Sequence, residues 1–168
     1  IICGGANDSV SKEMIDEAVK EVEEGDIVLL QNEISNVGYA AETAKKAGAK
    51  VALNPSPINE NLKMIPMNLV DYFILNEIEG KEISEAESEE PEEIMEKLKA
   101  KYPDAAFVLT LGEKGSWYFD KTRCFKQDIY KVKAVDTTAA GDTFCGYFLS
   151  GITKGREIPE ILKTASAA

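Results

Sequence analysis

The chain has 168 residues, 44% of them hydrophobic, so it is long enough to bury the core of one ordinary globular domain. Its net charge of −11 comes without a basic patch, which argues against a nucleic-acid partner. It has no histidine, which excludes a histidine-based triad and, with three cysteines that lack metal-ligand spacing, a zinc site. No apolar run reaches the length of a membrane span, and the odd number of cysteines favours a reducing, cytoplasmic setting.

The first half of the chain alternates between predicted strands and helices. A strand end at residues 1–3 leads into a glycine-rich turn, and apolar residues at helical spacing predict a helix over 12–24 that Gly25 ends. Residues 27–30 are apolar on both faces and lie between polar turns, a pattern typical of a buried parallel strand. The other elements predicted here are a helix over 37–44, a strand over 51–53 and a strand stop at the two prolines of 54–57.

The second half repeats this alternation around an acidic stretch. A strand is predicted over 72–75, and residues 82–93 carry seven acidic side chains and no basic one, which indicates a solvated surface. The later elements are a helix beginning near Pro91, a strand over 107–110, a hairpin of 117–119 with 124–125 and a helix after Asp142. We expect the three cysteines to be buried or half-buried.

This alternation predicts a single α/β domain over residues 1–168, with a parallel sheet and helices on both faces. In such folds, ligands bind beyond the carboxyl ends of the strands. Several polar or small residues follow the predicted strands and are therefore site candidates: Glu33, Asn54, Asn76, Glu79, Thr110 and Gly112.

The stretch 135–145 carries the strongest local signal for chemistry. Small residues run into Asp142, and an apolar helical pattern follows at once. A turn of small residues at a helix start leaves backbone N–H groups unpaired and suited to an anion. Asp142 cannot itself bind that anion, but it can take a proton from a group that attacks it. The combination predicts phosphoryl transfer to a hydroxyl, in which positioning and charge stabilisation supply most of the catalysis.

Six motifs follow one another along the chain: Gly4-Gly5-Ala6-Asn7, Leu30-Gln31-Asn32-Glu33, Asn54-Pro55-Ser56-Pro57, Asn76-Glu77-Ile78-Glu79, Thr110-Leu111-Gly112-Glu113-Lys114-Gly115 and Asp136-Thr137-Thr138-Ala139-Ala140-Gly141-Asp142. Their composition and order resemble the ribokinase (PfkB) family of sugar kinases over nearly all of the chain. The resemblance implies a ribokinase-like three-layer αβα fold with a mainly parallel sheet. Many members have glycine at the position of Ala139. The alanine here resembles the motif of the ribokinase branch, so we expect ribose to be the sugar and ribose 5-phosphate the product.

The resemblance also implies roles for residues on the sugar and phosphoryl side. Asp142 would be the base that deprotonates the primary hydroxyl of the sugar. The backbone N–H groups of Ala139, Ala140 and Gly141 would stabilise the phosphoryl group in transfer. Glu33 would hydrogen-bond the sugar hydroxyls.

Other roles implied by the resemblance concern ATP and its ions. Thr110 and Gly112 would line the nucleotide site. Asn76 and Glu79 would hold Mg²⁺ through water, since Mg²⁺ sheds its waters reluctantly. Asp136 and the carbonyl of Thr138 would bind a monovalent cation, which is potassium in this family.

Each of these residues also has a purely structural interpretation. Asp142 suits any helix N-terminus, because the helix dipole favours an acid there. Asn76 can cap the helix that follows it, and Glu79 can lie on the exposed face of that helix. The remaining candidates can be ordinary turn or strand-end residues: Glu33, Thr110, Gly112, Asp136 and Gly141.

The chain begins inside the family pattern and stops within the alanine-rich segment 165–168. We therefore expect a partial domain truncated at both ends, and no kinase activity from these 168 residues alone. Family members often dimerise through a lid that this chain lacks, so a homodimer is an expectation for the full-length protein only. The expected partners are a small sugar and ATP, without nucleic acid or membrane. Three alternatives stay open: another PfkB-type kinase acting on fructose, a deoxysugar acid or a nucleoside; a non-catalytic nucleotide- or phosphate-binding relative; and a natural short pseudoenzyme.

Overall fold

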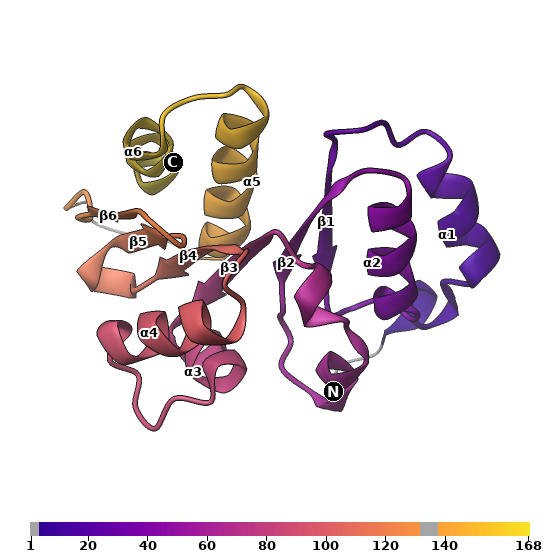
Figure 1. Ribbon diagram of the computed structural model, residues 1–168, viewed down its shortest axis with the longest axis horizontal. Helices are drawn as coiled ribbons and strands as arrows, with labels where there is room; N and C mark the ends of the chain where they lie inside the picture. Colours follow the sequence, from indigo (N-terminus) through magenta and orange to yellow (C-terminus); the bar gives the residue numbers. More distant parts are fainter. Residues whose placement is uncertain (1–3, 132–137) are drawn as a thin grey trace. The chain divides into compact units, whose positions relative to one another are not determined.

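The computed structural model of the protein describes residues 4–131 and 138–168, and it divides into two compact units, residues 1–73 and 74–168 (Figure 1). The predicted strand end at 1–3 and the candidate Asp136 lie outside the described residues. Six strands follow one another in the order β1-β2-β3-β4-β5-β6. Pairing is parallel from β1 to β3 and antiparallel from β4 to β6.

The first unit contains two parallel strands with helices packed beside them. In order it holds 3₁₀ helix η1 (Gly5–Ser9), α1 (Lys12–Val19), β1 (Ile27–Gln31), α2 (Val37–Lys46), β2 (Lys50–Asn54), η2 (Glu60–Met64), η3 (Met67–Leu69) and the start of β3 (Tyr72–Asn76). Helix α2 packs against β1 and β2, and α1 packs against α2. The register pairs Gln31 with Asn54, so both strands end at the same edge.

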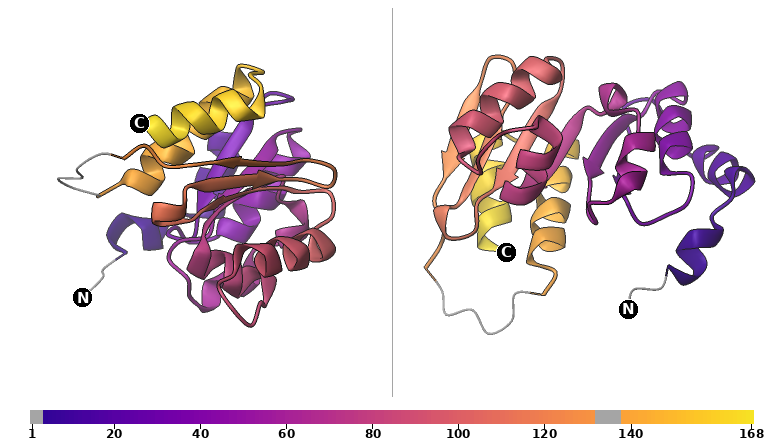
Figure 2. Two further views of the ribbon diagram at one scale, coloured as in Figure 1. Left: turned by 90° about the vertical axis from the view of Figure 1, so that its left-hand side faces the viewer. Right: turned by 90° about the horizontal axis from the view of Figure 1, so that it is seen from below.

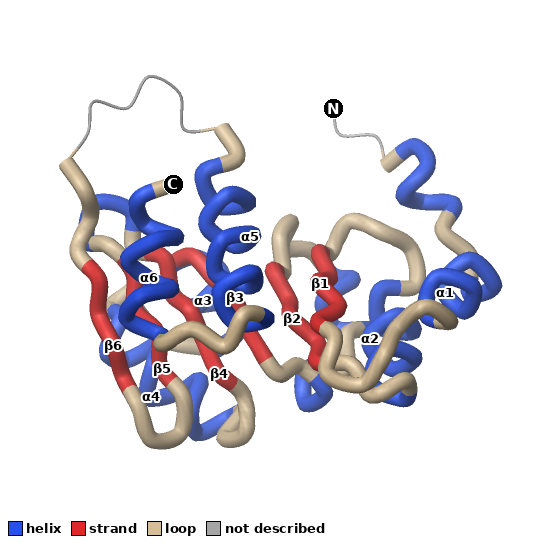
Figure 3. Tube along the Cα trace, turned by 90° about the horizontal axis from the view of Figure 1, so that it is seen from above, coloured by secondary structure: helices blue, strands red, loops and turns tan. Residues whose placement is uncertain are grey.

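The second unit places the strands β4 to β6 between two layers of helices (Figure 2). It holds the end of β3, then α3 (Glu77–Ser84), α4 (Pro91–Lys101), β4 (Ala106–Thr110), η4 (Gly112–Lys114), β5 (Ser116–Phe119), β6 (Cys124–Gln127), α5 (Ala140–Thr153) and α6 (Ile158–Ala167). Helices α5 and α6 run side by side on one face, as Figure 3 shows, and α3 and α4 cover the other. The fold confirms the predicted αβα class.

Helix α1 is shorter than its apolar pattern predicts. It ends at Val19, whereas the periodicity continues to residue 24. Acidic side chains at the end of a helix oppose its dipole, and Glu21, Glu23 and Glu24 would all lie there. The side chain of Asp26 also accepts a hydrogen bond from the N–H of Glu23 at 2.9 Å, which gives that backbone group a partner outside the helix.

The predicted hairpin is confirmed, and Asp120 explains its tight turn. Its carboxylate accepts hydrogen bonds from the N–H groups of Thr122 and Arg123 at 2.9 and 2.8 Å and from the Tyr118 hydroxyl at 2.9 Å. Burial raises the pKa of Asp120, but the Arg123 guanidinium and these bonds outweigh it and hold the pKa below its ordinary value. The charged carboxylate therefore fixes the turn at neutral pH.

Two expectations about burial are wrong. Cys124 is exposed, although Cys145 is buried as expected; Cys3 lies outside the described residues. Leu29 is 43% exposed, whereas Leu30, whose side chain points to the opposite face of β1, is buried, so the predicted burial of this strand on both faces is wrong. No helix in the described parts of the chain has both the length and the apolar character that crossing a membrane requires.

Candidate active site

In the first unit, three of the sequence motifs meet around Glu33. This residue is exposed in the turn that follows β1. Before it, the N–H of Asn32 donates to the carbonyl of Ser56 at 2.9 Å. After it, the N–H of Ser35 donates to the carbonyl of Asn7 at 2.9 Å. The turn that presents Glu33 is therefore held on both flanks by residues from the other two motifs.

Asn54 has a local role in this region. Its side-chain oxygen accepts a hydrogen bond from the N–H of Ser56 at 3.2 Å, which shapes the turn after β2. This geometry agrees with the structural interpretation of the Asn-Pro-Ser-Pro motif as a strand stop.

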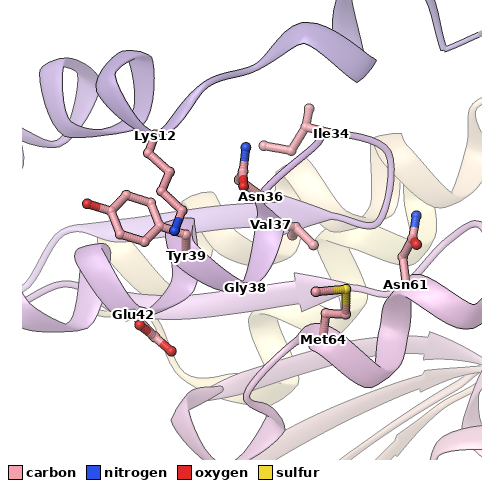
Figure 4. A pocket seen from close by; sticks show the side chains of 9 residues that line it. All are labelled: Lys12, Ile34, Asn36, Val37, Gly38, Tyr39, Glu42, Asn61 and Met64. Carbon is pink, nitrogen blue, oxygen red and sulfur yellow. The ribbon is translucent and has the colours of Figure 1, made fainter.

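A cavity of about 330 Å³ lies on the α2 side of the same turn (Figure 4). Lys12, Tyr39 and Glu42 contribute its larger polar and aromatic side chains, while Val37 and Met64 are apolar. The Lys12 ammonium lies 4.9 Å from the centre of the Tyr39 ring. None of the predicted site residues lines this cavity.

In the second unit, Asn76 and Glu79 bind each other at the end of β3. The Asn76 Oδ1 accepts a hydrogen bond from the N–H of Glu79 at 2.9 Å, and the Glu79 Oε2 accepts one from the N–H of Asn76 at 3.0 Å. This is a complete capping box at the start of α3. Glu79 is buried, so it does not lie on the exposed face of the helix.

The end of β4 lies next to this cap. The Thr110 hydroxyl donates to the carbonyl of Leu75 at 3.2 Å, which joins the end of β4 to the end of β3. Gly112 follows with a φ of 51°, a left-handed conformation that favours glycine. The carboxylate of Glu77, at the first position of α3, comes within 4.0 Å of the point where a Cβ at Gly112 would lie.

Helix α5 begins without a side-chain cap. Ala139 precedes it in the left-handed conformation, with a φ of 59°, and its methyl group cannot accept a hydrogen bond from the backbone. Asp142 lies in the first turn. A Cβ added at Gly141 would meet nothing within 4 Å, so the packing of the described residues does not require glycine there. Room for a ligand against the backbone would account for it.

A cavity of about 460 Å³ brings several predicted residues together. Five of them line it: Thr110, Gly112, Thr138, Ala140 and Gly141. Among the lining residues that the sequence did not predict are Ser116 and Ser166, whose hydroxyls lie 3.3 Å apart. They are separated by fifty residues, so no local spacing connects them. The cavity is chiefly formed by backbone and small side chains, as a phosphate-binding surface requires.

Cys145 lies one turn beyond Asp142. Burial raises the pKa of its thiol to about 11, and the Asp142 charge adds to the shift. The thiol is therefore protonated and unreactive at neutral pH.

No group of three or more acidic or cysteine side chains that could hold a metal ion occurs within residues 4–131 and 138–168. Mg²⁺ does not need such a group, because one or two protein oxygens, its own waters and substrate phosphates suffice. The capping box holds an amide and a carboxylate oxygen in fixed positions at the end of β3, which fits contact through water. Of the expected potassium ligands, the structure describes only Thr138.

Comparison with known proteins identifies relatives of the chain. The model of the pfkB family of carbohydrate kinases matches residues 1–168. Ribokinase from Lactococcus lactis is 35% identical to this chain, and the alignment covers 100% of this chain and 54% of the ribokinase. Deoxyribokinase from Salmonella typhi is 29% identical, and the alignment covers 98% of this chain and 55% of the deoxyribokinase. The chain thus spans about half the length of the curated relatives it matches.

Solved structures show the same likeness. Ribokinase from Thermotoga maritima is 34% identical with a TM-score of 0.77, and Arabidopsis thaliana ribokinase complexed with ribose and ATP is 30% identical with a TM-score of 0.78. Each comparison covers 100% of this chain and 56% of the other. The match of the family model to the whole chain, together with these relatives, shows that the chain belongs to the pfkB family of carbohydrate kinases.

Proposed function

We propose that the complete protein is an ATP-dependent sugar kinase that phosphorylates the primary hydroxyl of ribose. The observation that carries this proposal is the start of α5, where an uncapped helix turn with Asp142 opens onto a cavity shared with Thr110 and Gly112. The likeness to ribokinases, including one complexed with ribose and ATP, supports ribose as the sugar.

In the proposed reaction, Asp142 accepts the proton of the sugar hydroxyl. The hydroxyl oxygen then forms a bond to the γ-phosphorus of ATP, the bond from that phosphorus to the bridging oxygen breaks, and ADP leaves with that oxygen. Backbone N–H groups of Ala139, Ala140 and Gly141 stabilise the charge on the phosphoryl oxygens during transfer. In the first unit, Glu33 accepts hydrogen bonds from sugar hydroxyls.

The nucleotide and its ions have their own ligands in the proposal. Thr110 and Gly112 contact ATP at the end of β4. Asn76 and Glu79 hold Mg²⁺ through water, and the ion supplies positive charge that offsets the charge of the phosphates. Asp136 and the carbonyl of Thr138 bind potassium.

Replacing Asp142 with asparagine in the complete protein tests the base. Asparagine keeps the shape but cannot accept the proton, so turnover should fall at least about 100-fold while the Kd for ATP stays within about twofold. Unchanged turnover would contradict the role of Asp142 as the base. The same measurement distinguishes a kinase from a non-catalytic nucleotide-binding relative. The wild-type kinase turns over and the variant loses that turnover, whereas a binding relative shows no turnover in either form.

The sugar is tested separately with a panel of ribose, deoxyribose, fructose, a deoxysugar acid and a nucleoside. We expect the highest kcat/KM with ribose. Deoxyribose belongs in the panel because deoxyribokinase is among the relatives. A higher kcat/KM with any other member would overturn ribose while leaving the kinase activity in place.

A further inference from the structure

Asn32 is a buried amide beside the exposed carboxylate of Glu33. The residue is 3% exposed, and it immediately precedes the residue proposed to bind the sugar. The Nδ2 group donates two hydrogen bonds, to the carbonyl of Pro57 at 2.6 Å and to the Oδ1 of Asn59 at 3.0 Å. With the backbone bond to Ser56, three hydrogen bonds therefore join this one residue to the loop after β2.

The Oδ1 of Asn32 has no hydrogen-bond partner, and within the described chain it is the one buried side-chain oxygen or nitrogen in that condition. Leaving a buried acceptor unsatisfied destabilises the folded state, so such groups in native structures call for an explanation. The two bonds that the amide donates offset this cost, because they pair the carbonyl of Pro57 and the Oδ1 of Asn59. Leucine has a similar branched shape but can donate neither bond. The asparagine is therefore explained by the two groups that its side chain connects to the turn.

Those bonds act on a turn that is also fixed on its other flank. The N–H and hydroxyl of Ser35 both donate to the carbonyl of Asn7, at 2.9 and 3.2 Å. Asn36 donates from its side chain to the carbonyl of Val10 at 2.8 Å. Glu33 lies between these anchors, so removing the two side-chain bonds of Asn32 leaves the backbone bond to Ser56 as the remaining one of the three on the flank that joins it to β1.

We infer that Asn32 is a positioning residue that holds Glu33 in place for the sugar by hydrogen-bonding the turn after β1 to the loop after β2. The inference rests on the proposed function, since it acts through the contact between Glu33 and the sugar. Misplacing a hydrogen-bonding group by about an ångström weakens the interaction strongly. Because the contact exists both before and during the reaction, its loss affects KM rather than kcat.

The test compares Asn32→Leu with Asn36→Gly in the complete protein. Asn36→Gly removes a similar amide–carbonyl bond on the other flank, suits the φ of 61° at that position and leaves the two bonds of Ser35 intact. Asn32→Leu should raise the KM for ribose about tenfold, with kcat and the KM for ATP within about twofold of wild type. Asn36→Gly should leave all three parameters within about twofold.

Hydrogen–deuterium exchange of residues 33–36 supplies a measurement that does not depend on activity. Asn32→Leu should speed exchange in this segment about tenfold and leave α4 unchanged. Unchanged exchange, or faster exchange with an unchanged KM for ribose, would overturn the inference. If Asn32→Leu does not fold, Asn32→Ala removes both donors without adding volume or charge, with the same expectations. A wild-type protein that phosphorylates no sugar would refute the proposed function, while exchange would still decide whether Asn32 holds the turn.

Discussion

Asn76 and Glu79 cap each other across the first turn of α3, each side chain accepting a hydrogen bond from the backbone N–H of the other at 2.9 and 3.0 Å. The same two side chains are the proposed Mg²⁺ ligands. A structural role and a functional role therefore coincide at one place, and a substitution that preserves the cap while removing the charge can separate them.

Glu79→Gln is that substitution, because glutamine also completes a capping box. We expect the free energy of unfolding to change by less than about 0.5 kcal/mol, whereas Glu79→Ala should lower it by about 1 kcal/mol. Both variants of the complete protein should need more Mg²⁺ for half-maximal activity. Urea titration and activity measured against Mg²⁺ concentration check the two effects. Normal Mg²⁺ dependence in both variants would leave Glu79 with its capping role alone.

Gly141→Ala should separate folding from catalysis in the same way. A Cβ at this position meets nothing within 4 Å, and alanine is the better helix former, so the 168-residue chain should gain up to about 1 kcal/mol. In the complete protein the methyl group would block the approach of the phosphate to the backbone, and kcat should fall about 100-fold. Gly146→Ala is the matched control, because its Cβ also meets nothing. Equal kcat in the two variants would argue against an anion site at Gly141.

Gly151→Ala should destabilise the packing of α5 on α6. The new Cβ would lie 2.6 Å from the Cγ1 of Ile161, a fully buried side chain, so we expect a loss of about 1–3 kcal/mol. Urea unfolding of the 168-residue chain measures the loss, with Gly146→Ala as the reference on the same helix. In the background of Ile161→Ala the penalty of Gly151→Ala should shrink, because the overlapping atoms are absent. An undiminished penalty would show that crowding at Ile161 is not its cause.

The two described cysteines should differ in reactivity. Cys124 is exposed, whereas burial raises the pKa of Cys145 to about 11 from an ordinary value of 9.0, with the Asp142 charge adding to it. Iodoacetamide at pH 8 should therefore modify Cys124 within minutes and reach Cys145 only on unfolding, as peptide mass spectrometry would show.

The same shift sets the sign of a pH dependence. Between pH 9 and 11 the folded state keeps the Cys145 proton that the unfolded state has lost, so stability should fall as pH rises through this range. Cys145→Ala should flatten that fall relative to wild type. An equally steep fall in the variant would assign it to other groups.

The sequence predicted the strands well for a physical reason. Each is a short apolar run bounded by turn residues, so the predicted strand at 27–30 corresponds to β1, and the one at 107–110 to β4. Helix ends were less predictable. The end of α1 depends on the bond between Asp26 and the N–H of Glu23, and nothing in the apolar spacing reveals that bond.

The candidate site was predictable where its residues are contiguous. The start of α5 follows from the small residues before Asp142, because local sequence determines local backbone. Asn32 and Ser116 could not be found in this way. The partners of their side chains are 25 and 50 residues away, at Pro57 and Ser166, and only the strand pairing and helix packing bring them together.

Ala139 has one more consequence. A residue with a Cβ in the left-handed conformation costs the folded state about 1 kcal/mol, and glycine would avoid that strain. Alanine, however, also leaves the backbone fewer alternative conformations. An anion arriving at this turn would meet N–H groups that folding has already oriented, and little of its affinity would be lost in ordering them. Glycine at this position would remove the strain from the folded state but lower the affinity for the anion. The methyl group of Ala139 therefore lowers stability and raises affinity.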